Sequence, residues 1–223
     1  MSAGTRQRGR DRWITMGLDW PGYLGLLKAL GERGVPRLTY LDGRVTLVSP
    51  GDTHELLKKR LAALVEDVLV GLGIDHVASG QTTLRRRPRK AGVEGDETYY
   101  IARAGVVAEK TRIDLRVDPP PDLAIEVVVS HPVKDALEVY RRLRVPEVWV
   151  CDGASLRILI LGTDHRYAQA PASVALPLLT AAEILGWVQR PEALRNARWR
   201  QEIRAWVAAT LAPRHHALKD VGR

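Results

Sequence analysis

The sequence predicts an α/β protein of the α+β kind, with a mixed central β-sheet flanked by helices and a helical extension at the C-terminus. Two observations carry this prediction. Residues 123–129 form a continuous apolar run interrupted only by Glu126, which is typical of a central strand buried on both faces. A helical segment starting at Pro132 and a second apolar run over 147–151 follow it. This strand–helix–strand order favours a parallel pair within the sheet.

In the N-terminal half, turn signals alternate with periodic apolar segments. Asp42 and Gly43 form the strongest short hairpin signal, and the segments on either side of them alternate in polarity. Apolar residues at helical spacing then predict one long helix. The predicted elements are a helix over 19–31, strands over 37–41 and 44–49, a helix over 53–72, a strand pair over 74–79 and 82–87, and a short strand over 97–101.

The C-terminal half continues the same pattern with longer helices. Asp152 and Gly153 mark a turn between two strands, whereas residues 102–118 show no clear periodicity. The predicted elements are strands over 123–129, 147–151, 155–161 and 166–171, a helix from 132, and helices over 181–211. We therefore expect a disordered basic tail over 1–12, one domain over 13–180, and a C-terminal helical extension over 181–223.

The composition is that of an ordinary globular protein. The 223-residue chain is 45% hydrophobic and 27% charged, within the usual range for a soluble domain. No apolar run is long enough to span a bilayer, and the basic N-terminus lacks the apolar segment of a signal peptide. The single cysteine, Cys151, excludes an internal disulfide framework. We therefore expect a cytoplasmic protein with no membrane partner.

The net charge of +8 favours contact with polyanions. Basic residues gather over 6–12, 85–90, 141–144 and 195–204. For any one of these clusters a solvated surface is the better interpretation, but four together make a phosphate-binding face an equal alternative. The candidates for nucleic-acid contact are Arg85, Arg86, Arg87, Arg89 and Lys90.

Three motifs occur in a fixed order: Glu-Gly-Asp-Glu-Thr-Tyr-Tyr-Ile over 94–101, Pro-Pro-Pro-Asp-Leu-Ala-Ile-Glu-Val over 119–127, and Val-Pro-Glu-Val-Trp over 145–149. This ordered set resembles the Uma-type restriction endonucleases, a branch of the PD-(D/E)XK nuclease superfamily. The resemblance extends over residues 40–161 and continues more weakly to the C-terminal helices. It implies a restriction-endonuclease-like core and hydrolysis of DNA phosphodiester bonds with Mg²⁺ or Mn²⁺. Cleavage of both strands would, by analogy, call for a homodimer.

The resemblance places the two acidic metal ligands on Asp96 and Glu126. A carboxylate in an apolar β-segment is costly unless it is paired or binds a metal, and Mg²⁺ prefers such oxygen ligands. We expect these two carboxylates to converge at one end of the central sheet. The proline that relatives carry before the aspartate is Gly95 here. Glu55 is a candidate third metal-site residue, although the helix dipole alone also favours an acid at a helix start.

The catalytic lysine is the least regular part of the pattern. Two positions after the strand glutamate, where the superfamily carries a lysine or polar residue, this chain has Val128. In close relatives the lysine lies on the next helix, at the position of Ala136, whereas this chain offers Lys134. Residues two apart on a helix do not share a face. Lys134 is therefore either a displaced catalytic lysine, or the chain is an inactive nuclease-like fold that binds nucleic acid or a protein partner.

Other site chemistries are weaker readings of the sequence. We interpret His54, beside a helix start, as a cap or surface residue, with substrate contact as the alternative. Neither His215-His216 nor Cys151 has the partner spacing of a zinc site. Only 5% of the residues are aromatic and none is phenylalanine, which argues against the sugar-binding platform of a glycosidase.

Overall fold

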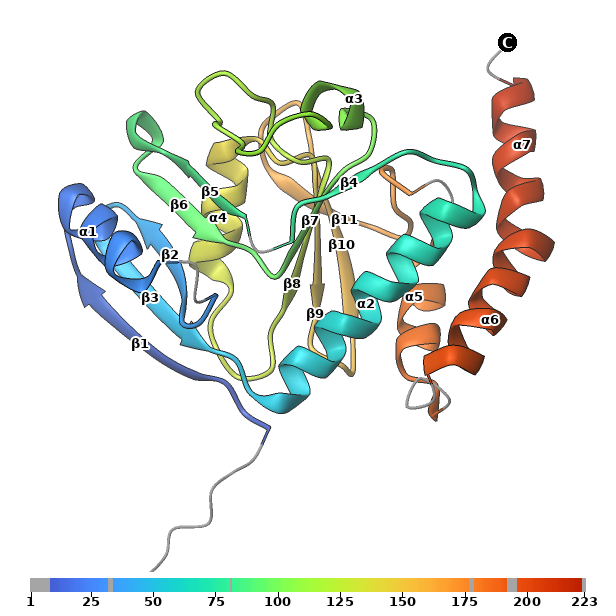
Figure 1. Ribbon diagram of the computed structural model, residues 1–223, viewed down its shortest axis with the longest axis horizontal. Helices are drawn as coiled ribbons and strands as arrows, with labels where there is room; N and C mark the ends of the chain where they lie inside the picture. The colour runs from blue at the N-terminus through green and yellow to red at the C-terminus, as the bar shows by residue number, and fades with distance from the viewer. Residues whose placement is uncertain (1–8, 32–33, 81, 177–178, 192–195, 222–223) are drawn as a thin grey trace, which may run out of the picture.

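Two β-sheets and the helices around them make up the computed structural model, which describes residues 9–31, 34–80, 82–176, 179–191 and 196–221 (Figure 1). The six-stranded sheet has the order β11-β10-β9-β8-β7-β4 and the five-stranded sheet the order β1-β3-β2-β6-β5. The strands are β1 Arg12–Gly17, β2 Arg37–Leu41, β3 Arg44–Ser49, β4 Val77–Ala78, β5 Thr83–Arg86, β6 Ala91–Glu94, β7 Glu97–Tyr100, β8 Leu123–Val127, β9 Glu147–Cys151, β10 Leu156–Leu161 and β11 Tyr167–Ala170. The helices are α1 Trp20–Leu30, α2 Asp52–Gly71, α3 Ala104–Val107, α4 Lys134–Leu143, α5 Ala181–Val188, α6 Asn196–Trp206 and α7 Ala212–Val221.

The six-stranded sheet is mixed, as the sequence predicts. β8 and β9 are parallel, and the other neighbouring strands are antiparallel. Every residue of β8 and β9 is buried, in keeping with the uninterrupted apolar runs that predict them. Because side chains alternate along a strand, Leu123, Ile125 and Val127 enter one hydrophobic cluster and Ala124 another. Glu126 therefore lies on the same face of the sheet as Ala124.

The five-stranded sheet is antiparallel throughout and was predicted only in part. The hairpin of β2 and β3 around Asp42 is confirmed. The predicted pairing of 74–79 with 82–87 is wrong, because β4 pairs with β7 in one sheet and β5 with β6 in the other. Strand β1 was not predicted at all, since its six residues are exposed and show no burial pattern.

The helices divide the molecule into layers (Figure 1). α4 lies between the two sheets, and its Val139 and Tyr140 join a core with Val93 of β6 and Val148 of β9. α2, α5 and α6 cover the other face of the six-stranded sheet, where Trp199 is fully buried. α1 covers the outer face of the five-stranded sheet. At one point of that contact Tyr23 of α1 packs over Gly92, where a Cβ atom would lie 2.5 Å from the Tyr23 hydroxyl.

The structure describes part of the expected N-terminal tail and most of the expected C-terminal extension, and the division into domains stays a prediction. Residues 1–8 of the predicted tail lie outside the described residues, but Arg12 starts β1 and Asp11 is buried. The predicted helices over 181–211 are present where the chain is described, with residues 192–195 outside it. They pack into the main core through Ile184 and Ile203, and a π-helical segment, Val207–Leu211, joins α6 to α7. No helix in the described ranges is long and apolar enough to cross a membrane.

Candidate active site

Asp96 and Glu126 are brought together by the pairing of β7 with β8. Glu97 lies opposite Ile125 in this antiparallel pair, so the same register, continued by one residue, sets Asp96 opposite Glu126. Directly opposed residues share one face of a sheet. The backbone N–H of Val127 donates to Asp96 Oδ2 at 2.6 Å, which fixes one carboxylate against the strand that carries the other. Both side chains line a cavity of about 20 Å³ between the two sheets, enough for one water-sized species.

A residue of α4 forms a hydrogen bond to the Glu126 side chain. The Tyr140 hydroxyl donates to Glu126 Oε1, and Glu126 is only 6% exposed. Burial raises the pKa of Glu126 above its ordinary value, although Tyr140, Arg37 and His131 act in the opposite direction. Gly95 makes room for this arrangement, because a Cβ atom there would collide with the Tyr140 hydroxyl. The loss of the expected proline therefore has a steric reason.

The cation inside the cavity is Arg37, the first residue of β2. Its side chain is buried, its guanidinium contacts Asp96 Oδ1, and it donates to Glu55 Oε1 at 2.7 Å. Sequence reasoning missed this residue. The available signal was the period of two along the strand, because Thr39, two residues on, lines the same cavity.

His54 also belongs to the site, and our interpretation of it as a cap or surface residue is wrong. The side chain lies in the first turn of α2, which points between the two sheets, and is 1% exposed. His54 Nε2 lies 3.0 Å from Asp96 Oδ1 and 2.9 Å from Arg37 Nη1. Burial lowers the pKa of His54, with Arg37 adding to the effect while Asp11 opposes it. The neutral ring is therefore favoured.

Glu55 reaches the carboxylate pair only through Arg37. It is half-exposed, binds Lys58 Nζ at 3.0 Å through its other oxygen, and is not among the residues that line the cavity. Burial raises the pKa of Glu55, but Lys58 and Arg37 outweigh burial and hold it below the ordinary value. A direct role for Glu55 in metal binding stays a prediction.

The structure does not bring Lys134 to the cavity. Lys134 is the exposed first residue of α4, whereas the next two residues, Asp135 and Ala136, line the cavity. At 3.6 residues per turn, Lys134 and Ala136 point to nearly opposite sides of the helix. Ala136, where the family resemblance implies a lysine, thus lines the cavity in place of Lys134, and the role of Lys134 stays a prediction.

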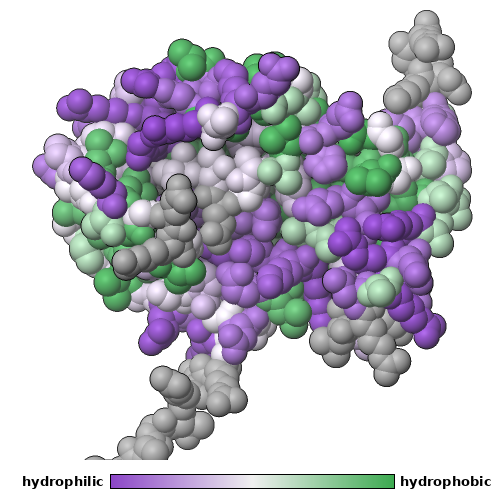
Figure 2. All heavy atoms as spheres, viewed as in Figure 1, coloured by the Kyte–Doolittle hydropathy of each residue, from purple (hydrophilic) through white to green (hydrophobic). Residues whose placement is uncertain are grey.

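The basic segment forms one wall of a separate groove of about 780 Å³. Arg85, Arg86 and Arg87 line this groove, while Arg89 and Lys90 are exposed outside it. Hydrophilic side chains prevail at this edge of the molecule, around β5, β6 and the loops next to α3 (Figure 2). The groove is also lined by Lys110, Arg112 and Arg116, and by Asp114, which pairs with Arg116.

One hydrogen bond joins a residue that lines the groove to a residue that lines the carboxylate cavity. Thr83, which lines the groove, donates its hydroxyl to Glu94 Oε1 at 3.2 Å. Glu94 lines the cavity.

Comparison with known proteins bears on the family and the fold. A family model described as "Uma2: Putative restriction endonuclease" matches residues 20–194. Among solved structures, the chain is similar to a "putative nuclease belonging to DUF820" from Anabaena variabilis ATCC 29413. The TM-score is 0.51 at 14% identity, over 69% of this chain and 92% of that chain. At this identity the likeness shows a shared fold. No curated protein matches the chain.

Proposed function

Because the chain belongs to the Uma2 family of putative restriction endonucleases, we propose that it is a divalent-metal-dependent endonuclease that hydrolyses phosphodiester bonds in DNA. One observation carries the proposal: Asp96, the residue before β7, lies opposite Glu126 of β8 when the printed register is continued by one residue, and both line one small buried cavity. Paired carboxylates of this kind suit Mg²⁺ or Mn²⁺. By analogy, we propose a homodimer as the form that cleaves both strands.

The residues present fit such an ion. Asp96 and Glu126 offer hard carboxylate oxygens, and the cavity volume of about 20 Å³ admits one small species. The raised pKa of Glu126 reflects a buried carboxyl group that lacks a full counter-charge, and a cation beside it favours its ionised form. When bound, a divalent ion supplies polarisation of the phosphoryl oxygen and a lowered pKa for the attacking water.

The chain's own side chains would position the ligands and the substrate. Val127 N–H and the Tyr140 hydroxyl fix one oxygen each of Asp96 and Glu126. Arg37 is the cation at the cavity, and a guanidinium can donate two parallel hydrogen bonds to a phosphate. We propose that Arg37 turns from Asp96 toward the scissile phosphate and stabilises the charge that develops there.

The competing function is a nuclease fold that binds DNA without cutting it. The observation that favours it is the absence of a lysine at both expected positions, Val128 and Ala136. Supercoiled plasmid incubated with Mg²⁺ or Mn²⁺ distinguishes the two functions, with EDTA as the metal-free control. We expect nicked and linear products that require metal. A protein that binds the plasmid but yields no product with either ion would favour the inactive reading.

Lys134 can be tested within the same assay. If Arg37 supplies the positive charge, Lys134→Ala should cleave within about threefold of the wild-type rate, since an exposed substitution away from the cavity changes little. Abolished cleavage in a correctly folded Lys134→Ala protein would instead assign the catalytic cation to Lys134.

We expect the affinity for DNA to fall steeply as the salt concentration rises, because the arginines of the groove contact phosphates. Replacing Arg85, Arg86 and Arg87 together by alanine removes up to three phosphate contacts, so the slope of log K against log salt should fall by about 2–3 units. Fluorescence anisotropy with a labelled duplex at several salt concentrations measures this slope. The charge-matched control replaces Arg190, Arg198 and Arg214, which pair with acids on the C-terminal helices. Equal slopes in the two triple variants would place the DNA elsewhere.

A further inference from the structure

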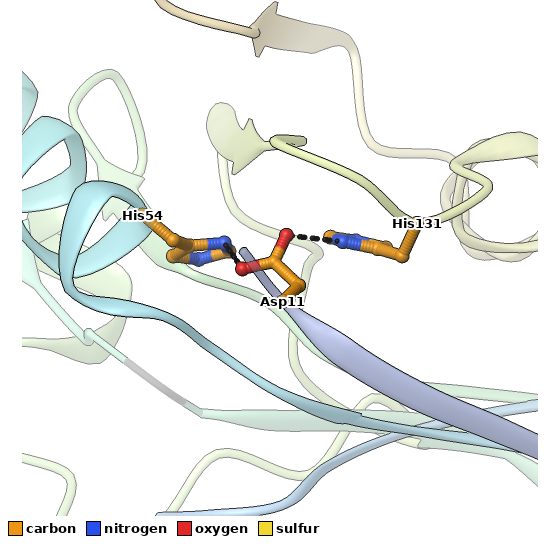
Figure 3. Close-up of side chains that lie close together, drawn as sticks. All are labelled: Asp11, His54 and His131. Atoms are coloured by element: carbon orange, nitrogen blue, oxygen red, sulfur yellow. Dashed lines mark hydrogen bonds and ion pairs between the residues drawn. The ribbon is translucent and has the colours of Figure 1, made fainter. Parts of the chain in front are cut away.

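A second group of metal-ligand side chains lies beside the carboxylate pair. Asp11, His54 and His131 come from three separate segments: the residue before β1, the first turn of α2 and the loop after β8. Their ligand atoms all lie within 4.8 Å of one another, and the Asp11 carboxylate lies between the two imidazole rings (Figure 3). Asp11 is 7% and His54 1% exposed. Among the described residues, this is the group that meets the spacing of a metal site.

The distances suit ligands of one ion. His131 Nδ1 lies 2.8 Å from Asp11 Oδ2, and His54 Nδ1 lies 3.2 Å from Asp11 Oδ1. Nitrogen and oxygen ligands held at about 2.0–2.1 Å from a tetrahedral ion are about 3.3 Å apart. These two contacts use different oxygens of Asp11, and ligand atoms taken one per residue lie within 4.8 Å of one another, so the three side chains must move closer together to hold one ion.

His54 is already oriented as a ligand. Its buried Nδ1 atom has no hydrogen-bond partner among the described residues, while Nε2 lies 3.0 Å from Asp96 Oδ1. In the tautomer that donates its Nε2 proton to Asp96, instead of accepting there from Arg37, the Nδ1 lone pair faces Asp11. A carboxylate that accepts from the distal nitrogen is the usual outer-shell partner of a metal-bound histidine.

We propose that Asp11, His54 and His131 bind one first-row transition-metal cation of the Zn²⁺ type, at a centre distinct from the Asp96–Glu126 pair. Two imidazole nitrogens and one carboxylate oxygen select such borderline cations over Mg²⁺, which prefers oxygen ligands. Three protein ligands leave a fourth position for water or a substrate oxygen.

The surroundings prepare Asp11 as an anionic ligand. The backbone N–H of Gly51 donates to Oδ1 at 3.1 Å, and that of Val129 to Oδ2 at 3.3 Å. The ion would thus link β1, α2 and the end of β8 beside the active site. Because His54 also contacts Asp96, the ion would help to position that carboxylate.

Isothermal titration calorimetry with ZnCl₂ and with MgCl₂ tests the centre directly, on full-length protein stripped with EDTA. We expect wild type to bind one equivalent of Zn²⁺ and to melt at a higher temperature with Zn²⁺ present. His131→Gln keeps an amide donor for Asp11 but removes the imidazole. Its Zn²⁺ affinity should fall more than tenfold, since changes even in the outer shell cost about 10–100-fold.

Three variants separate this centre from other sites. Glu126→Gln disables the proposed catalytic pair and should bind Zn²⁺ as wild type does. His165→Asn changes an exposed histidine whose φ of 62° asparagine tolerates, and it should also bind normally. If His131→Gln does not fold, His54→Gln takes its place and should lose the same affinity. The proposal would be overturned if folded wild type bound no Zn²⁺, or if His131→Gln and His54→Gln both bound Zn²⁺ as wild type does. Loss of Zn²⁺ binding in Glu126→Gln would also overturn it. Failure of plasmid cleavage alone would not affect it.

Discussion

The Glu126→Gln variant is expected to cleave DNA about 10³-fold more slowly than wild type at saturating Mg²⁺, while keeping its fold. Glutamine has nearly the same size and keeps an oxygen that can accept from the Tyr140 hydroxyl, but it carries no charge to hold a divalent cation. Metal polarisation supplies several kcal/mol of transition-state stabilisation, and each 1.36 kcal/mol corresponds to a factor of about ten. Initial rates of plasmid nicking measure the loss, with a thermal melt to check the fold.

Glu94→Gln is the matched control for this experiment. Glu94 lines the same cavity, and burial likewise raises its pKa above the ordinary value. Its oxygens accept from Leu38 N–H and from the Thr83 hydroxyl, bonds that a glutamine oxygen can partly keep. We expect less than a tenfold loss of rate. Similar rates in the two variants would contradict a specific role for Glu126.

The Arg37→Met variant should lose about 3–5 kcal/mol of unfolding free energy, the usual cost of removing one partner from a buried ion pair. Arg37 is buried, and its guanidinium contacts both Asp96 and Glu55. Methionine keeps most of the side-chain length but leaves Asp96 buried without that cation. Urea denaturation should show a lower midpoint at an unchanged m-value. Added Mg²⁺ should restore part of the loss by binding the freed carboxylates.

Arg44→Met provides the comparison on the same hairpin. Arg44 makes a two-bond pair with Asp135, at 2.8 and 3.0 Å, but its side chain is 53% exposed. An exposed pair contributes about 0–1 kcal/mol, so this variant should unfold near the wild-type midpoint. Equal destabilisation by the two substitutions would show that Arg37 acts as a packing element only.

The fold could be predicted from sequence where a pattern is local. Three elements are predicted by a pattern in their own residues: the apolar run predicts β8, Asp42-Gly43 predicts the turn after β2, and the apolar periodicity predicts α2. The pairing of β5 could not be predicted in this way. β5 is a strand of four residues with mixed burial, so its own sequence fits pairing with either β4 or β6. Its pairing with β6 depends on contacts between the sheets and α4.

The site residues also differ in whether a local sequence pattern predicts them. Asp96 and Glu126 lie in motifs whose order resembles a known family, so sequence reasoning finds them. Arg37, His54 and Asp11 contribute through contacts that span 42 residues between His54 and Asp96 and 120 residues between His131 and Asp11. No local periodicity encodes such contacts. They depend on where the first turn of α2 and the start of β1 meet the end of β8.

The most direct measurement of the central claim is the position of a metal in crystals soaked with MnCl₂, located by anomalous diffraction at the manganese edge. The account predicts a peak within about 2.0–2.6 Å of carboxylate oxygens from both Asp96 and Glu126, with the Arg37 guanidinium moved off Asp96. A peak only at Asp11, His54 and His131, or no ordered peak in soaked crystals, would contradict a metal-dependent catalytic pair at Asp96 and Glu126.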